Sequence, residues 1–217
     1  MKLSEEDKSR IEKLAAQVEA STGVQVLAVV AGKSDVYPEI PWRAFSLGAA
    51  LSTLALTLFD AFRPARIAQP ALAQAIVILG TGLVLALAAI FLRPAARMFL
   101  GDARAEAETR QFALSYFYER GLSRTHSRNA LLVLVSQFER CAAVVADTGI
   151  TAQITQTDLD KISANMNVIL ARGSASAALM SGLAALDELL RSHGFNAPPR
   201  SGDEIAEEFL ETEGPKS

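Results

Sequence analysis

The chain of 217 residues has only one cysteine, Cys141, and two histidines, His126 and His193. A single cysteine excludes an internal disulfide and every metal site that needs several thiolate ligands. The sequence also contains no glycine-rich phosphate loop, no cysteine–histidine cluster and no HExxH motif. No segment therefore carries a specific catalytic signature. Cys141 adjoins an apolar run and is interpreted as a packing residue.

The chain also has little excess charge of either sign. Lys and Arg number 21 against 24 Asp and Glu, which gives a net charge of -3. Nucleic-acid binding needs a basic surface, and single-strand binding also needs aromatic side chains among the basic ones. Aromatic residues make up only 6% of the chain and do not cluster with basic residues. We therefore expect no nucleic-acid partner.

The few side chains suited to acid–base or nucleophilic catalysis have plainer roles in their local sequence. His126 stands between Arg124 and Arg128, which predicts a solvated loop, with the holding of an anionic group as the alternative. His193 stands at a predicted helix end, where a cation complements the helix dipole. Ser136 has no nearby histidine or acid partner and no nucleophile-elbow glycines, so we expect it to serve a turn.

Charge is missing altogether from two long apolar stretches, residues 44–59 and 67–92. About 20 apolar residues span a bilayer as a helix. The charges between the two stretches all lie within residues 60–66, which fits a tight connector. The pattern predicts a transmembrane hairpin at residues 42–93, with spans at 43–60 and 67–92.

The uncharged spans indicate anchoring rather than transport, because ion and proton pathways need ionisable groups inside the membrane. Small residues let transmembrane helices approach closely, and Gly48, Gly80 and Gly82 supply them. We also expect hydrogen bonds across the helix pair from its hydroxyl side chains, Ser46, Ser52, Thr53, Thr57 and Thr81.

The orientation follows from the arginines beside the spans. A two-helix hairpin returns the chain to the side that it left, so both flanks share a compartment. The flanks carry more arginines than the connector, with Arg43, Arg93, Arg97 and Arg104 against Arg63 and Arg66. The positive-inside rule then places both termini in the cytoplasm. The charged N-terminal segment lacks the apolar core of a signal peptide. We therefore predict a multi-pass protein of a bacterial-type inner (plasma) membrane.

Outside the hairpin, the periodicity of apolar residues predicts alternating helices and strands. Helices are expected from a cap at Ser4 to residue 22 and at 102–119, 158–171 and 174–193, with strands at 24–31, 130–135 and 138–146. One strand precedes the hairpin and two follow it.

A single strand is not stable alone, so the flanks, residues 1–41 and 94–195, are predicted to fold together as one split α/β (α+β) domain. The predicted architecture is a small mixed sheet flanked by helices, with the hairpin inserted after the first strand. Residues 196–217 read as a flexible acidic tail, with 204–210 transiently helical.

Two blocks of this pattern resemble the TPM-domain family, which includes thylakoid acid-phosphatase-like proteins, photosystem II repair factors and receptor auxiliary subunits. Residues 18–37 (VEASTGVQVLAVVAGKSDVY) are similar to its helix end, Thr-Gly turn and first strand. Residues 127–150 (SRNALLVLVSQFERCAAVVADTGI) are similar to its paired strands. The resemblance implies a small sheet sandwiched by helices. Many members have a signal peptide and an extracytoplasmic domain. This chain departs from them by placing its membrane segment inside the domain, and it resembles a bacterial membrane-anchored member.

The resemblance also implies candidate site residues. Some members are phosphatases or calcium binders that use acidic residues near the end of the third strand and in the following loop. The acids available there are Asp147, Asp158 and Asp160, and calcium is the one cofactor implied. Thr155 stands where members place an acid, and hard cations need several oxygen ligands. Glu139-Arg140, between the paired strands, is either an exposed or locally paired turn or a recognition site.

Two functions are compatible with these residues. The first, which we favour, is a non-enzymatic scaffold or adaptor that is held in the lipid bilayer and binds a membrane-protein partner during assembly or maintenance. The second is a metal-dependent phosphatase with Asp147, Asp158 and Glu139 as candidate acids. The phosphatase requires at least two carboxylates that reach one cation or one phosphate, whereas the adaptor does not.

Overall fold

The computed structural model describes residues 3–62, 70–125, 128–196 and 209–215 and divides the chain into two compact units. One unit comprises residues 1–36 and 102–217, and the other comprises residues 37–101. The larger unit is an α/β domain made from two separate parts of the chain. The smaller is a helical hairpin inserted after the first strand, as predicted.

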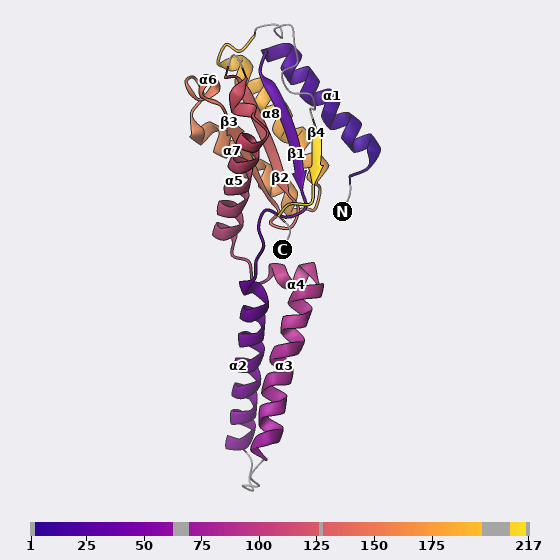
Figure 1. The fold of residues 1–217 in the computed structure, drawn as a ribbon, viewed down its shortest axis with the longest axis vertical. Helices are drawn as coiled ribbons and strands as arrows, with labels where there is room; N and C mark the ends of the chain where they lie inside the picture. Colours follow the sequence, from indigo (N-terminus) through magenta and orange to yellow (C-terminus); the bar gives the residue numbers. More distant parts are fainter. Residues whose placement is uncertain (1–2, 63–69, 126–127, 197–208, 216–217) are drawn as a thin grey trace. The chain divides into compact units, whose positions relative to one another are not determined.

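The α/β unit contains a four-stranded mixed sheet of order β3-β2-β1-β4 (Figure 1). Strand β1 (Gln25–Ala31) pairs in parallel with β2 (Ala130–Ser136) over its whole length. Strand β3 (Cys141–Ala146) runs antiparallel to β2. The two central strands are continuous apolar runs because helices cover both of their faces.

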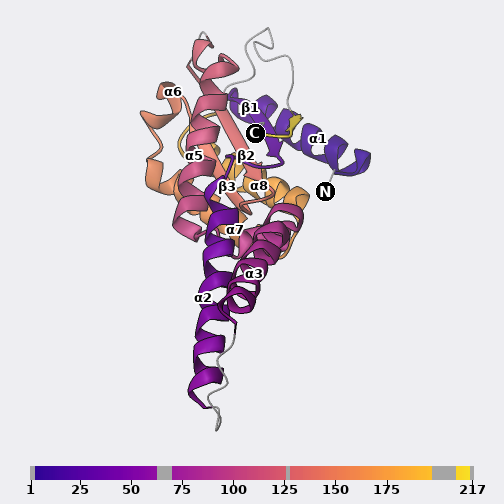
Figure 2. The same ribbon diagram turned by 60° about the horizontal axis from the view of Figure 1, so that its bottom comes forward.

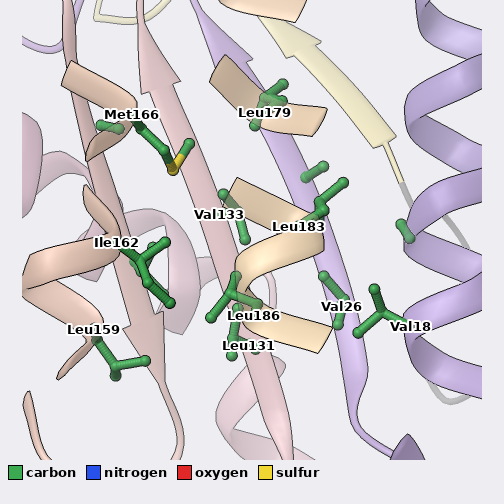
Figure 3. Close-up of a cluster of buried hydrophobic side chains, with 14 of the residues drawn as sticks. Val18, Val26, Leu131, Val133, Leu159, Ile162, Met166, Leu179, Leu183 and Leu186 are labelled. Carbon is green, nitrogen blue, oxygen red and sulfur yellow. The ribbon is translucent and has the colours of Figure 1, made fainter. Parts of the chain in front are cut away.

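Alternate residues of each strand enter two separate cores, as the period of two in a strand requires. Val26 of β1 and Leu131 and Val133 of β2 face the core formed with α1 (Glu5–Thr22), α7 (Gln156–Ala171) and α8 (Ala175–Ser192). Figure 3 shows side chains from α1, α7 and α8 converging on these strands.

The other face of the sheet packs against a single long helix, α5 (Asp102–Glu119). Leu27 and Leu132 project to this side and meet Ala113 and Phe117 of the helix. The short helix η1 (Leu122–Arg124) closes this second core with Leu122. The predicted small sheet with helices on both faces is therefore present, and strands β1 to β3 and helices α1, α5, α7 and α8 begin and end within a few residues of the predicted bounds.

The helix ends follow their local sequence. Ser4 caps α1 by accepting a hydrogen bond of 3.1 Å from the Asp7 backbone N–H, as expected for a serine at this position. Gly23 ends α1 in the left-handed region, at φ 70°, where glycine has no steric penalty. A four-residue helix, α6 (Thr148–Thr151), follows β3 and begins at Asp147.

The prediction of a flexible acidic tail at residues 196–217 is wrong at its end, because Phe209–Thr212 form a fourth strand, β4. This strand pairs in parallel with Ala28–Ala31 of β1. Glu211 accepts a hydrogen bond of 3.1 Å from the Leu3 backbone N–H and lies 3.0 Å from the Lys8 ammonium. Glu5 and Glu211 accept hydrogen bonds from Lys8 and raise the pKa of its ammonium group. Most of the predicted transient helix, 204–210, lies outside the described residues.

The attachment of β4 depends on glycine at position 214. Gly214 has φ 84°, and a Cβ placed there would lie 1.8 Å from the Lys33 carbonyl oxygen. We expect Gly214→Ala to detach β4, so that backbone amides of residues 209–212 exchange hydrogen much faster than in the wild type. Gly173→Ala is the matched control, because Gly173 also has a positive φ but a Cβ there meets nothing within 4 Å. Unchanged protection of β4 in Gly214→Ala would contradict this packing.

The inserted unit consists of α2 (Glu39–Ala61), α3 (Ala71–Phe91) and the short α4 (Arg93–Arg97). The two long helices lie side by side (Figures 1 and 2). Both are long and apolar enough to cross a membrane, by length and composition. Helix α2 begins four residues before the predicted span. The first residues predicted for the second span, 67–69, lie outside the described residues, as do the connector residues Arg63 and Arg66.

Candidate functional site

The carboxyl ends of the parallel strands β1, β2 and β4 meet at one edge of the sheet, where ligands bind in open α/β folds. The segment after β1 and the turn between β2 and β3 lie together there. The backbone N–H groups of Gln137 and Phe138 donate to the carbonyl oxygens of Ala31 and Gly32, at 2.9 and 3.1 Å. Glu139 stands in this turn.

Glu139 is the buried centre of this edge. Glu139 is only 2% exposed to solvent. One carboxyl oxygen accepts a hydrogen bond of 2.8 Å from the Ser34 backbone N–H. The other accepts a hydrogen bond from the Ser136 hydroxyl group. The Ser34 hydroxyl in turn lies 3.5 Å from the Thr109 hydroxyl of α5. Glu139 thus ties the segment after β1 to the β2–β3 turn.

Of the two forms expected for a plain turn at Glu139-Arg140, exposed or locally paired, Glu139 is buried and is paired with Ser136, three residues earlier. Arg140 is exposed and adopts the left-handed region at φ 53°. Ser136 is fully buried and serves the turn, as predicted. The expectation that it has no acid partner nearby is wrong, because its hydroxyl group donates a hydrogen bond to Glu139, three residues later. Sequence periodicity cannot reveal the burial of Glu139, since an acidic residue in a turn between strands is ordinarily solvated. Recognition by Arg140 stays a prediction.

Removal of the Glu139 carboxyl group would leave two buried donors, the Ser34 N–H and the Ser136 hydroxyl, without their acceptor. We expect Glu139→Ala to lower the free energy of unfolding by about 2–4 kcal/mol, because buried unpaired donors keep their full desolvation cost. Urea unfolding followed by circular dichroism in detergent measures this. Glu12→Ala, on the exposed face of α1, is the control and should change stability by less than about 0.5 kcal/mol. Equal effects of the two substitutions would refute the bridging role.

The three candidate metal ligands stand in separate local environments. Asp147 begins α6 and accepts a hydrogen bond of 2.7 Å from the Thr148 backbone N–H. Asp160 lies 2.9 Å from the Gln156 amide nitrogen and 3.4 Å from Arg110 of α5. Asp158 and Asp160 are two residues apart on α7, and such positions do not share a helix face.

Asp158 has local partners of its own. Its carboxyl group accepts hydrogen bonds of 2.8 Å from the Lys161 ammonium and 2.6 Å from the Thr155 hydroxyl. These donors, Lys161 foremost, hold the pKa of Asp158 below its usual value. Thr155, at the position where the resemblance implies an acid, therefore serves the start of α7. Among the described residues, no group of three or more His, Cys, Asp or Glu side chains is arranged to hold a metal ion.

Asp147 has one feature that its sequence context did not reveal. It is 5% exposed, and its second carboxyl oxygen is buried with no hydrogen-bond partner among the described residues. Arg128, at 3.8 Å from the first carboxyl oxygen, is its nearest cation in the described part of the chain. Buried oxygens of Thr125 and Gln25 also have no partner among the described residues. His126, next to Thr125, lies outside the described residues.

His193 and Cys141 have structural roles. His193 ends α8 as predicted: its backbone N–H donates to Leu189 and Leu190, and its Nδ1 lies 2.9 Å from the Leu189 carbonyl oxygen. Cys141 opens β3 and is half-buried, and its thiol lies 3.6 Å from the Glu139 carbonyl oxygen.

Comparison with known families finds a match for the part of the α/β unit that follows the hairpin. The family model of the TPM domain matches residues 99–189, from before α5 into α8. The chain contains a TPM domain. The match includes Glu139, Asp147, Asp158 and Asp160, whereas α1, β1 and the hairpin precede it. No curated protein matches this chain.

A solved structure supports the fold of this TPM domain. It is the NMR structure of BA42 protein from the psychrophilic bacterium Bizionia argentinensis sp. nov., with a TM-score of 0.54 and 11% sequence identity. The alignment covers 97% of this chain and 96% of that one. At this identity the likeness concerns the fold alone.

The two long helices of the inserted hairpin are held together by a close glycine contact. A Cβ on Gly48 would lie 2.9 Å from the Gly82 Cα, and a Cβ on Gly82 would lie 2.9 Å from the Phe45 ring. Gly48 and Gly82 therefore let the two backbones meet, as predicted for small residues between apolar helices. Gly80 takes no part, because a Cβ there meets nothing within 4 Å.

The expectation that hydroxyl groups bond across the pair is wrong for the four hydroxyl residues with a described bond. Ser52, Thr53, Thr57 and Thr81 each donate to a carbonyl oxygen of their own helix, four residues earlier. That carbonyl is the nearest acceptor for a hydroxyl in a helix. At the connector end, the Gln74 amide donates to Asp60 at 3.0 Å.

Proposed function

We propose that this protein is a membrane-anchored adaptor. In this proposal the α2–α3 hairpin spans the inner membrane, and the TPM domain on the cytoplasmic side binds a membrane protein during its assembly or maintenance. The observation that carries the proposal is the exposed apolar surface of both long helices, which includes Leu54 and Leu58 of α2 and Ile76, Leu79 and Val84 of α3. Contact of such an apolar surface with the hydrocarbon of a bilayer is favourable, whereas its exposure to water is not.

The polar residues of the TPM domain favour binding over catalysis. Glu139, Asp158 and Asp160 each accept hydrogen bonds within the domain, which occupy carboxyl oxygens that a catalytic cation would need. Arg140 stands exposed at the carboxyl edge, next to Glu139, whose buried side chain accepts a hydrogen bond from the Ser34 backbone N–H. A rigid turn with an outward cation suits the recognition of a partner protein, since a preorganised surface loses less entropy on binding.

Site-specific photo-crosslinking tests the adaptor. We expect p-benzoylphenylalanine at position 140 to give a discrete adduct with an integral membrane protein in intact cells. The same probe at Arg172, an exposed residue at the end of α7, is the matched control and should give no such adduct. Equal adducts from both positions, or none from position 140, would contradict recognition at this turn.

A metal-dependent phosphatase is the second candidate, and Asp147 is the observation that favours it. Its buried, unpartnered carboxyl oxygen is the kind of atom that a bound cation satisfies, because calcium and magnesium prefer carboxyl oxygens. Arg128 lies beside it and carries the charge that would orient a phosphate group.

Calorimetric titration with calcium and magnesium, beside an assay on an aryl phosphate, separates the two candidates. The adaptor predicts no metal-dependent turnover by purified protein in detergent. The phosphatase predicts saturable metal binding and turnover that Asp147→Asn abolishes and Asp160→Asn retains, since Asp160 is solvent-exposed and paired with Arg110. Turnover with this pattern would overturn the adaptor.

A further inference from the structure

Most of the charged residues that the structure describes in the inserted unit lie at the end opposite the connector. Among its described residues, Glu39, Arg43, Arg93 and Arg97 lie where α2 begins and α3 gives way to α4. Asp60 alone stands at the connector end of the described part. Three cations against one anion give this end a net positive charge.

Large apolar side chains are interleaved with these arginines. Trp42 is 72% exposed and Met98 is 85% exposed. Each of them is next to an arginine in the sequence. Trp42 packs edge-on against Phe45, with ring centroids 6.4 Å apart. Aromatic side chains of this kind collect at the headgroup level of a bilayer.

The break between α3 and α4 and one hydrogen bond of Arg43 determine where the arginines of this end lie. Leu92 is extended, at φ -112° and ψ 104°, so α4 starts as a helix separate from α3. The Arg43 guanidinium donates a hydrogen bond of 3.1 Å to the Phe99 carbonyl oxygen, which ties the segment after α4 to α2. One of its five N–H donors is used in this way. The bond holds the Arg43 guanidinium beside the segment that carries Arg93 and Arg97.

We infer that this basic collar, defined as Trp42, Arg43, Arg93, Arg97 and Met98, binds the phosphate headgroups of anionic phospholipids. The inference rests on the proposed membrane location and adds a lipid preference to it. Guanidinium groups match phosphate oxygens in a planar, two-pronged geometry. Trp42 and Met98 enter the acyl boundary of the same lipids, which a free phosphate ion lacks, so a lipid fits the collar better than an ion.

Trp42 is the only tryptophan of the chain and reports directly on the lipids around the collar. The full-length protein is reconstituted in phosphatidylcholine vesicles with a fixed share of phosphatidylglycerol, and bromine is placed on the acyl chains of one lipid class at a time. We expect brominated phosphatidylglycerol to quench Trp42 more than brominated phosphatidylcholine at equal mole fraction. The preference should be at least about twofold, because each arginine near the surface attracts anionic lipid.

Substitution then identifies the side chains responsible. Arg93→Gln, at an exposed residue, should reduce the preference, and Arg93→Gln combined with Arg43→Gln should remove it. Arg93→Gln remains informative if loss of the Arg43–Phe99 bond disturbs the double variant. Arg172→Gln, in the TPM domain, is the matched control and should keep the preference.

The outcomes separate the collar from the proposed function. Quenching that is equal for both lipids would overturn the collar and leave the membrane hairpin standing. An absence of quenching by either lipid would show that Trp42 is outside the bilayer, which contradicts the proposed membrane location and the collar with it. A preference that Arg93→Gln does not change would also overturn the assignment to these arginines.

Discussion

The parallel pairing of β1 with β2 is the constraint on which the rest of the structure depends. Seven residues of β1 pair with seven of β2, although residues 32–129 separate the two strands. Both strands are almost fully buried, so neither can leave the sheet without exposing a core face. Whatever lies between them must therefore begin and end on one side of any membrane. Two spans satisfy that condition and one span does not.

The carboxyl edge of the sheet shows how the domain tolerates this insertion. The chain leaves β1 toward the hairpin at Gly32, and Glu139 holds Ser34 two residues later. Helix α5 joins the same cluster through Thr109 after the chain returns. Long insertions cost little in loop entropy, but their ends must be fixed. The Glu139 carboxyl group fixes the end that follows β1, which gives the buried carboxyl group a structural role.

Sequence alone was sufficient for the elements with strong periodicity. Leu179, Leu183, Leu186 and Leu190 mark one face of α8, and the apolar runs at 25–31 and 130–136 mark buried strands, so the mixed sheet and the inserted hairpin could be predicted. Strand β4 could not, because four residues within an acidic segment carry no pattern, and tertiary pairing with β1 decides their structure.

Predictions of site residues were weaker for the same reason. The burial of Glu139 and the unpartnered oxygen of Asp147 depend on contacts between segments distant in sequence, such as Ser34 with Glu139. Hydrogen-bond partners that are close in sequence, by contrast, can be inferred from the sequence. Thr155 and Lys161 lie within one helical turn of Asp158, so their pairing with it follows from helix geometry.

The central claim is that both halves of the TPM domain lie on one side of a membrane that the hairpin crosses twice. Single-cysteine labelling tests it most directly, in a Cys141→Ala background, with Glu12→Cys before the hairpin, Arg172→Cys after it and Phe62→Cys at the connector end of α2. A membrane-impermeant maleimide added to intact inner-membrane spheroplasts should label position 62 and spare positions 12 and 172 until the membrane is opened. Labelling of position 12 or 172 in sealed spheroplasts, or protection of position 62 together with the other two, would contradict the account.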